Sequence, residues 1–187
     1  MLERGTPVDG VASWTPLDEA IYWCQTDIAR DLAGRGASMA RLRRAAGLGD
    51  MDAIDGFFDA AGQLIAMAGP IASPWGQEGA IDGGDASQNI LDHAFVMAVN
   101  TRQADAATTL LARGARINAK PPGFHWNGTA LHAACWRGDR DLVDWLLDEG
   151  ADPSITDDMD GVGVDAIAWA RHHGNDHLIP LLEAGSR

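Results

Sequence analysis

The sequence predicts an all-α solenoid in which short helix–turn–helix units stack side by side and one long loop is inserted. Three observations support this fold class. The segment Gly128–Pro153 reads as a complete helix–turn–helix unit. Four other segments repeat its pattern, and two short helices bury their apolar faces only when further copies stack on them. The chain has 187 residues, 46% of them hydrophobic, which is enough for a single domain with its own core.

The segment GTALHAACWRGDRDLVDWLLDEGADP contains start and stop signals for two helices. Thr129 suits the N-cap of the first helix, and Gly138 suits its C-terminal stop. Asp139 suits the N-cap of the second helix, and Gly150 supplies the left-handed residue that ends it. The apolar residues of this second helix recur at helical spacing and form one buried stripe, namely Leu142, Val143, Leu146 and Leu147.

The other copies follow the same order of signals. In the second copy Phe57 and Phe58 fill the leucine positions, and the last copy carries Pro180 inside its second helix, as expected of a terminal cap. The stretch after the second copy is rich in Gly, Pro, Ser and Ala and has no helical period, so it is predicted to be a long loop. Within one domain spanning 1–187, we expect repeats at about 11–37, 38–64, 89–118, 125–153 and 160–185, and an insertion at 65–88.

Two tetrapeptides, Thr15-Pro16-Leu17-Asp18 and Thr129-Ala130-Leu131-His132, carry a signature of a known family. With them the chain resembles the ankyrin-repeat family, whose unit of about 33 residues contains T-P-L-H-x-A. Gly150-Ala151-Asp152-Pro153 matches the family's repeat ending. The resemblance is to a bacterial-type member with about five degenerate repeats, and it implies that His132 makes structural hydrogen bonds between repeats. The spacing from Leu32 to Phe57 is about eight residues short of the period, so the first two repeats lack a normal finger loop between them.

The resemblance also implies where a partner binds. In this family partners usually contact the concave face, which is made of finger-loop tips and the exposed side of each first helix. At the corresponding positions of this chain, the concave face consists of the two residues before the position that ends each first helix, and of the tip of the finger loop at 118–127. The predicted partner-binding residues are Tyr22, Trp23, Asn100, Thr101, His125, Trp126, Trp136, Arg137, His172 and His173. Aromatic and arginine side chains are typical binding anchors, but tryptophans can also fill gaps between degenerate repeats.

Charge and composition narrow the class of partner. The net charge of −13 disfavours nucleic acid and anionic membranes, and it is compatible with a basic protein partner. No apolar run approaches the length of a membrane span, and the first residues do not resemble a signal peptide, so a soluble cytoplasmic protein is expected. Two cysteines are too few for a disulfide scaffold. The basic cluster Arg35, Arg41, Arg43 and Arg44 either pairs with acids of neighbouring repeats or forms a patch for an anionic group.

Catalytic and metal-binding motifs are missing from the sequence. It contains no nucleophile elbow, phosphate loop, HExxH or dinucleotide fingerprint, so no catalytic residue, cofactor or metal is predicted. An acid–base pair would have to come from Asp18 with Glu19, or from Asp92 beside His93. Carboxylates that cap helices or face solvent are commoner than catalytic ones. Adjacent histidines such as His172 and His173 diverge on a helix, so zinc would need ligands from elsewhere, among them His125, His93 or Asp92.

These observations favour a non-catalytic protein–protein interaction module that binds a partner on its concave aromatic and histidine-rich face. An inhibitor or immunity-type role is a variant of this hypothesis, because strong acidity suits a basic target. The alternative from another class is a small-molecule binder or unusual enzyme, in which the insertion 65–88 and the loop 118–127 form walls or a lid over the groove. A homodimer that uses the same face is a third interpretation.

Overall fold

A computed structural model describes residues 8–9, 14–65, 68, 86–158 and 162–185 of the chain. The described residues are helical and contain no β-strand, only an isolated bridge between Phe58 and Leu64. Most of the predicted insertion 65–88 lies outside the described residues. The helices are α1 (Pro16–Tyr22), α2 (Thr26–Gly34), α3 (Leu42–Leu48), α4 (Met51–Asp55), α5 (Ala86–Asn100), α6 (Ala104–Ala112), α7 (Ala130–Arg137), α8 (Arg140–Asp148), α9 (Ala166–His172) and α10 (Ile179–Gly185), with the 3₁₀ turn η4 (Asp176–Leu178) before α10.

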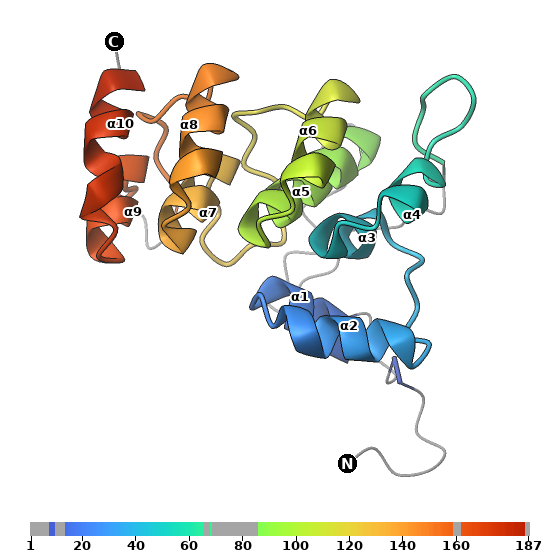
Figure 1. Ribbon diagram of the computed structural model, residues 1–187. Helices are drawn as coiled ribbons and strands as arrows, with labels where there is room; N and C mark the ends of the chain where they lie inside the picture. The colour runs from blue at the N-terminus through green and yellow to red at the C-terminus, as the bar shows by residue number, and fades with distance from the viewer. Residues whose placement is uncertain (1–7, 10–13, 66–67, 69–85, 159–161, 186–187) are drawn as a thin grey trace.

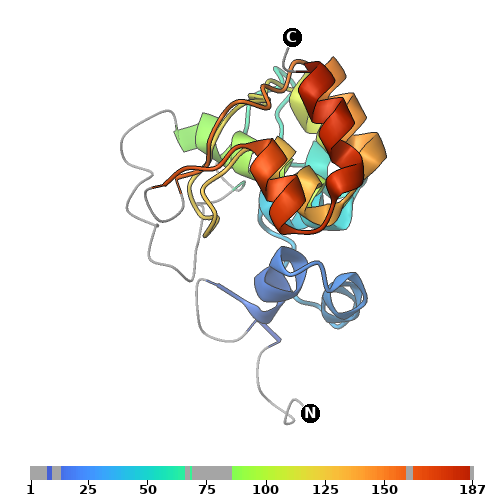
Figure 2. The same ribbon diagram turned by 90° about the vertical axis from the view of Figure 1, so that its left-hand side faces the viewer.

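The helices from α3 onwards form a row of hairpins (Figure 1). Helices α5, α7 and α9 make one layer of the row, and α6, α8 and α10 make the other. Helix α5 packs between α3 and α7, and α7 packs in turn against α9. Figure 2 looks along the row and shows the connection from α6 to α7 and the described part of the connection from α8 to α9 projecting to one side. This arrangement agrees with the predicted all-α repeat fold.

The turns that follow the first helices share one backbone conformation wherever they are described. Each places a residue in the left-handed region, with φ between +56° and +72°. Glycine occupies three of these positions, whereas Cys24 and Arg102 adopt the same conformation against the steric preference of a side chain. The next residue always donates its backbone N–H to the carbonyl of a fully buried alanine, in the pairs Gln25 to Ala20, Asp50 to Ala45, Gln103 to Ala98, Asp139 to Ala134 and Asn175 to Ala170.

The ends of α2, α6 and α8 share a second conformation. Gly36, Gly114 and Gly150 have φ of +91°, +98° and +92°, which favours glycine. The alanine after each glycine donates its backbone N–H to a leucine carbonyl, as when Ala151 donates to Leu146 over 2.8 Å. The repeat endings that the sequence places in register therefore have the same backbone geometry.

Three details differ from the prediction. Helix α4 ends at Asp55, so Phe57 and Phe58 follow the helix instead of lying in it, although Phe57 is still buried. Pro180 is the second residue of α10, where a missing backbone N–H costs no helical hydrogen bond, because N–H groups in the first turn have no acceptor within the helix. Helix α5 begins at Ala86, so the last three residues of the predicted loop are helical.

The first hairpin does not continue the row but lies across it (Figure 1). The connection at 35–41 is short, as the reduced repeat spacing predicts. Gly47 of α3 allows α1 to approach closely, because a Cβ atom there would lie 2.2 Å from Cγ2 of Ile21. The side-chain amide of Asn100 donates to the Tyr22 carbonyl over 3.0 Å. The end of α1 is therefore fixed against α5, in addition to the contact that α1 makes with α3.

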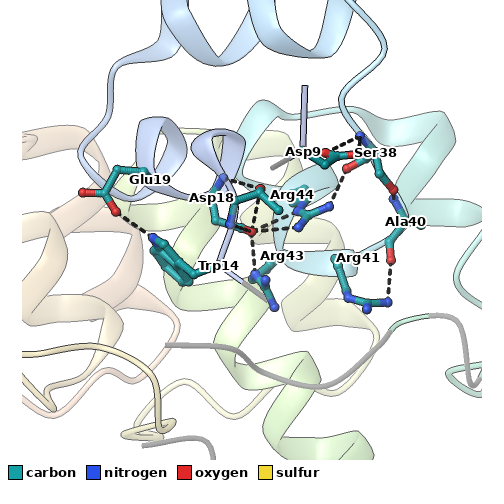
Figure 3. A network of polar contacts seen from close by, with 10 residues as sticks. Asp9, Trp14, Asp18, Glu19, Ser38, Ala40, Arg41, Arg43 and Arg44 are labelled. Carbon is teal, nitrogen blue, oxygen red and sulfur yellow. Dashed lines mark hydrogen bonds and ion pairs between the residues drawn. The ribbon is translucent and has the colours of Figure 1, made fainter. Parts of the chain in front are cut away.

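A buried ion-pair network joins α1 to α3 (Figure 3). Asp18 occupies the signature position that His132 holds in the fourth repeat. Its carboxylate accepts a hydrogen bond from Nε of Arg43 over 2.8 Å and two from Arg44, over 2.9 and 2.7 Å. Burial raises the pKa of Asp18, but the hydrogen bonds from Arg44 and the charge of Arg43 outweigh it, so the pKa lies well below its usual range.

The predicted pairing of the basic cluster with acids of a neighbouring repeat is thus confirmed for Arg43 and Arg44. Arg35 instead pairs with Asp31 of its own helix at an exposed position, and Nη1 of Arg41 donates to the adjacent Ala40 carbonyl. Cys24 and Cys135 are free thiols. Within the described ranges, no helix has the length and apolar character needed to cross a membrane.

Candidate functional site

A hollow of about 460 Å³ lies between α7, α9 and the segments that precede them. Its volume is within the range of about 300–1,000 Å³ that is typical of ligand pockets. Its walls combine aromatic rings with the small apolar side chains Val162, Val164 and Ala168. We use the name aromatic groove for the rings of this hollow together with the neighbouring Trp23, that is, for Trp23, His125, Trp136, Trp169, His172 and His173.

Trp136 is held in place by its neighbour Arg137. The Arg137 guanidinium lies 4.2 Å from the centre of the Trp136 ring. It also donates two hydrogen bonds to the side-chain oxygen of Asn100, over 3.1 and 2.8 Å. Because Asn100 in turn contacts the first hairpin, the position of Trp136 depends on α1, α5 and α7 together. Trp23 completes this end of the groove, with its ring centre 6.4 Å from that of Trp136.

The loop 118–127 is anchored in the core. Phe124 and Trp126 are fully buried. Phe124 stacks on Tyr22 of α1 and on His93 of α5, with ring centres 5.8 and 4.5 Å apart. The loop is also tied to the next connection, since Nδ2 of Asn127 donates to Asp158. It therefore forms a fixed wall of the groove, to which it contributes His125.

Tyr22 determines the tautomer of His125. The Tyr22 hydroxyl accepts the backbone N–H of His125 over 3.1 Å and lies 2.5 Å from Nδ1 of the same residue. Burial raises the pKa of Tyr22 far above its ordinary value, so the hydroxyl keeps its proton and donates it to Nδ1. Neutral His125 consequently carries its own proton on Nε2. Burial also lowers the pKa of His125, which favours this neutral form.

The far wall of the groove comes from α9. The Trp169 indole donates to the buried Asp157 carboxylate and packs against Trp136 at 6.1 Å between ring centres. His173 lies 5.6 Å from Trp136 and 5.2 Å from Trp169. Burial lowers the pKa of His173, and the neighbouring charges of His172 and Arg137 add to this effect. The imidazoles of His172 and His173 are exposed at the mouth of the hollow.

The predicted partner-binding residues fall into three groups. Trp23, His172 and His173 are exposed, whereas His125, Trp136 and Arg137 are half-buried. The expected exposure is wrong for the other four, since Tyr22, Asn100, Thr101 and Trp126 are buried. Tyr22, Asn100 and Trp126 contact His125, Arg137 and Trp136 respectively and so support the groove. The Thr101 hydroxyl instead donates to a carbonyl of α5.

Four lining residues were missing from the predicted set, namely Trp169, Val162, Val164 and Ala168. Trp169 lies three positions before His172, so both side chains are on one face of α9. That helical spacing is the signal that identifies it. Val162 and Val164 precede α9 in a connection whose path the sequence pattern does not determine.

The carboxylates considered for acid–base chemistry have structural partners. Asp92 is buried and accepts hydrogen bonds from Arg116 over 2.7 and 2.8 Å. Glu19 accepts the indole N–H groups of Trp14 and Trp23. His132 accepts the backbone N–H of Thr129 at Nδ1, and its Nε2 donates to Val164 in the next repeat over 3.1 Å, which confirms the predicted link between repeats. No cluster of three metal-binding side chains occurs among the described residues.

His93 is fully enclosed, and its two ring nitrogens have no hydrogen-bond partner in the described part of the chain. Burial lowers its pKa from the ordinary value of 6.5 to about 3. The folded protein therefore holds His93 neutral, while the unfolded chain binds a proton as the pH falls through 6.5. The stability that this residue contributes is complete above pH 6.5 and is lost progressively below it.

We expect His93→Phe to reduce the acid sensitivity of the fold. Between pH 7.5 and 5, wild-type protein should lose about 2 kcal/mol more of its free energy of unfolding than the variant does, since each pH unit below 6.5 is worth about 1.4 kcal/mol per group. Urea unfolding at a series of pH values measures this difference. His177→Phe, at an exposed histidine of η4, is the control, and parallel pH profiles for wild type and His93→Phe would contradict the expectation.

Comparison with known proteins finds a family match for one repeat of the chain. The family model for the ankyrin repeat matches residues 127–158, which include α7 and α8. The chain is also 42% identical over 60 residues to the Arabidopsis thaliana protein named "Putative E3 ubiquitin-protein ligase XBAT35". That alignment covers 32% of the chain and only 13% of the plant protein. Ankyrin repeats generally mediate protein–protein interaction. These matches show an ankyrin repeat at 127–158, and the other hairpins share its turn geometry.

Proposed function

We propose that the chain is a non-catalytic interaction module that binds a protein partner in the aromatic groove. The observation that carries this proposal is the exposure of large apolar surface at one place. Three large hydrophobic side chains are exposed in the described residues, and two of them, Trp23 (41%) and Val162 (81%), lie beside or in the groove. Aromatic side chains that are fixed by their neighbours bind a partner at a low cost in conformational entropy.

The fixed geometry of the groove supports the same proposal. Arg137 and Asn100 hold Trp136, Tyr22 orients His125, and Asp157 holds Trp169. A preformed surface loses little free energy to ordering when a partner binds. An inhibitor or immunity-type role would rest on the net charge of −13 alone, so the proposal does not extend to it.

Site-specific photo-crosslinking in the lysate of the source organism tests the proposal. A benzophenone side chain at position 172, at the mouth of the groove, should form a protein adduct. The same group at position 144, on the exposed side of α8, is the control. The adduct should disappear when Trp136→Ala is added, provided that circular dichroism shows the variant folded.

Each outcome has a defined meaning. Adducts of equal yield from both positions would place the interface elsewhere. A Trp136-dependent adduct of twice the chain mass would show that the partner is a second copy. If no protein is captured, but a small molecule raises the melting temperature of wild type and not of Trp136→Ala, the groove is a ligand pocket and the proposal is wrong.

A further inference from the structure

The ionisable side chains that line the hollow are all of one chemical type. In the described residues they are all imidazoles, from His125, His172 and His173. At the edge, Arg137 adds a guanidinium above Trp136. The whole chain has 27 acidic residues against 14 basic ones, yet no described Asp or Glu is part of this lining. The described lining of the hollow is therefore free of carboxylates in an acidic protein, and the exposed Glu19 beside Trp23 lies outside that lining.

A cationic ligand is poorly suited to this site. Indole faces attract ammonium groups, and two tryptophans line the hollow. However, Arg137 already occupies one face of Trp136. A further cation would lie beside this guanidinium, with no carboxylate of the described lining to compensate for the repulsion.

An anionic ligand meets the opposite conditions. Imidazole and guanidinium N–H groups form charge-assisted hydrogen bonds with carboxylates, which are among the stronger polar contacts in proteins. The rings of Trp136 and Trp169 and the side chain of Val164 provide apolar surface next to these donors. A ligand that matches both features carries a carboxylate adjacent to a bulky apolar side chain.

We propose that the partner presents an acidic–hydrophobic peptide segment to the groove. Its aromatic or branched aliphatic side chain enters the hollow, and the carboxylate of a nearby Asp or Glu binds His172 and His173. This inference rests on the proposed function and names its partner class. It reverses the expectation from net charge, because the groups that line the site determine the sign of the segment that binds there.

Selection from a displayed library of short random peptides tests this inference with the full chain as bait. Wild type should enrich peptides with Asp or Glu within two residues of Trp, Phe or Leu. The double variant His172→Glu, His173→Glu should enrich Lys and Arg at those places instead. His177→Glu makes the same substitution on η4, outside the lining of the hollow, and should select the same peptides as wild type.

Calorimetry on one enriched peptide then measures the contribution of the carboxylate. Replacing its acidic residue with Gln should weaken binding to wild type about tenfold. Two results would overturn the inference while leaving the proposed function intact: apolar peptides enriched without an acidic preference, or equal affinity of the Glu and Gln peptides. Failure of wild type to enrich any peptide would count against both the inference and the proposed function.

Discussion

Asp18→Asn is expected to lower the free energy of unfolding by about 3–5 kcal/mol. The substitution keeps the size of the side chain but removes the charge that compensates two buried arginines. The side chains of Arg43 and Arg44 are only 5% and 6% exposed, so water does not replace the lost carboxylate. Asp18 also accepts the backbone N–H of Thr15, so the N-cap of α1 is weakened at the same time. Urea unfolding at pH 7 measures the effect.

A matched substitution is available in the same hairpin. Asp31 pairs with Arg35 over 2.8 Å, but both side chains are more than half exposed. Asp31→Asn should therefore change the free energy of unfolding by about 0.5 kcal/mol or less. A loss below about 1 kcal/mol for Asp18→Asn, or equal losses for the two variants, would show that the buried network does not hold the first hairpin.

The repeat fold was predictable because its signals are local. A glycine stop, a buried alanine and a leucine stripe each act within one hairpin, and they recur at similar spacing along the chain. The structure gives these signals the same backbone hydrogen bonds, even where Cys24 and Arg102 replace the glycine. The ends of elements were less predictable. Helix α4 ends at Asp55 with Gly56 as its C-cap, although Phe57 and Phe58 after it resemble the leucines of other repeats.

The binding face was only partly predictable, because its exposure depends on contacts between distant segments. Position within the repeat placed Tyr22 and Asn100 on the concave side. The first hairpin turns across the row, however, and the 118–127 loop inserts Phe124 between Tyr22 and the fifth helix. No local pattern specifies that turn. The close approach of Ile21 to Gly47 and the ion pairs of Asp18 specify it, and both join residues more than twenty positions apart.

Net charge does not describe the lining of the hollow, for a related reason. A sum over the chain does not say where the charges lie. Two acidic residues near the groove accept hydrogen bonds from indoles, Asp157 from Trp169 and Glu19 from Trp23. Three of the six histidines meet at the hollow, where His125 joins the adjacent pair His172 and His173 from a distant part of the sequence. Folding thus creates a hollow whose described lining lacks the negative charge of the chain as a whole.

Trp126→Ala is expected to lower the free energy of unfolding by about 3–5 kcal/mol, as for other large aromatic side chains truncated in a core. Trp126 is fully buried, and its ring centre lies 4.6 Å from Phe124, 5.3 Å from Trp136 and 5.6 Å from Tyr22. Truncation would leave a cavity under the groove and loosen the loop that carries His125. Urea unfolding, with intrinsic fluorescence of the remaining tryptophans, measures the loss.

Trp23→Ala is the control, because this side chain is 41% exposed and its truncation should cost about 1 kcal/mol. The pair separates two roles that the sequence assigned to both residues. Trp23→Ala should weaken partner binding in a protein that remains stable, whereas Trp126→Ala should act through stability. If Trp126→Ala kept its stability and lost its partner, Trp126 would contact the partner directly, and the burial of the 118–127 loop would have to be reversible on binding.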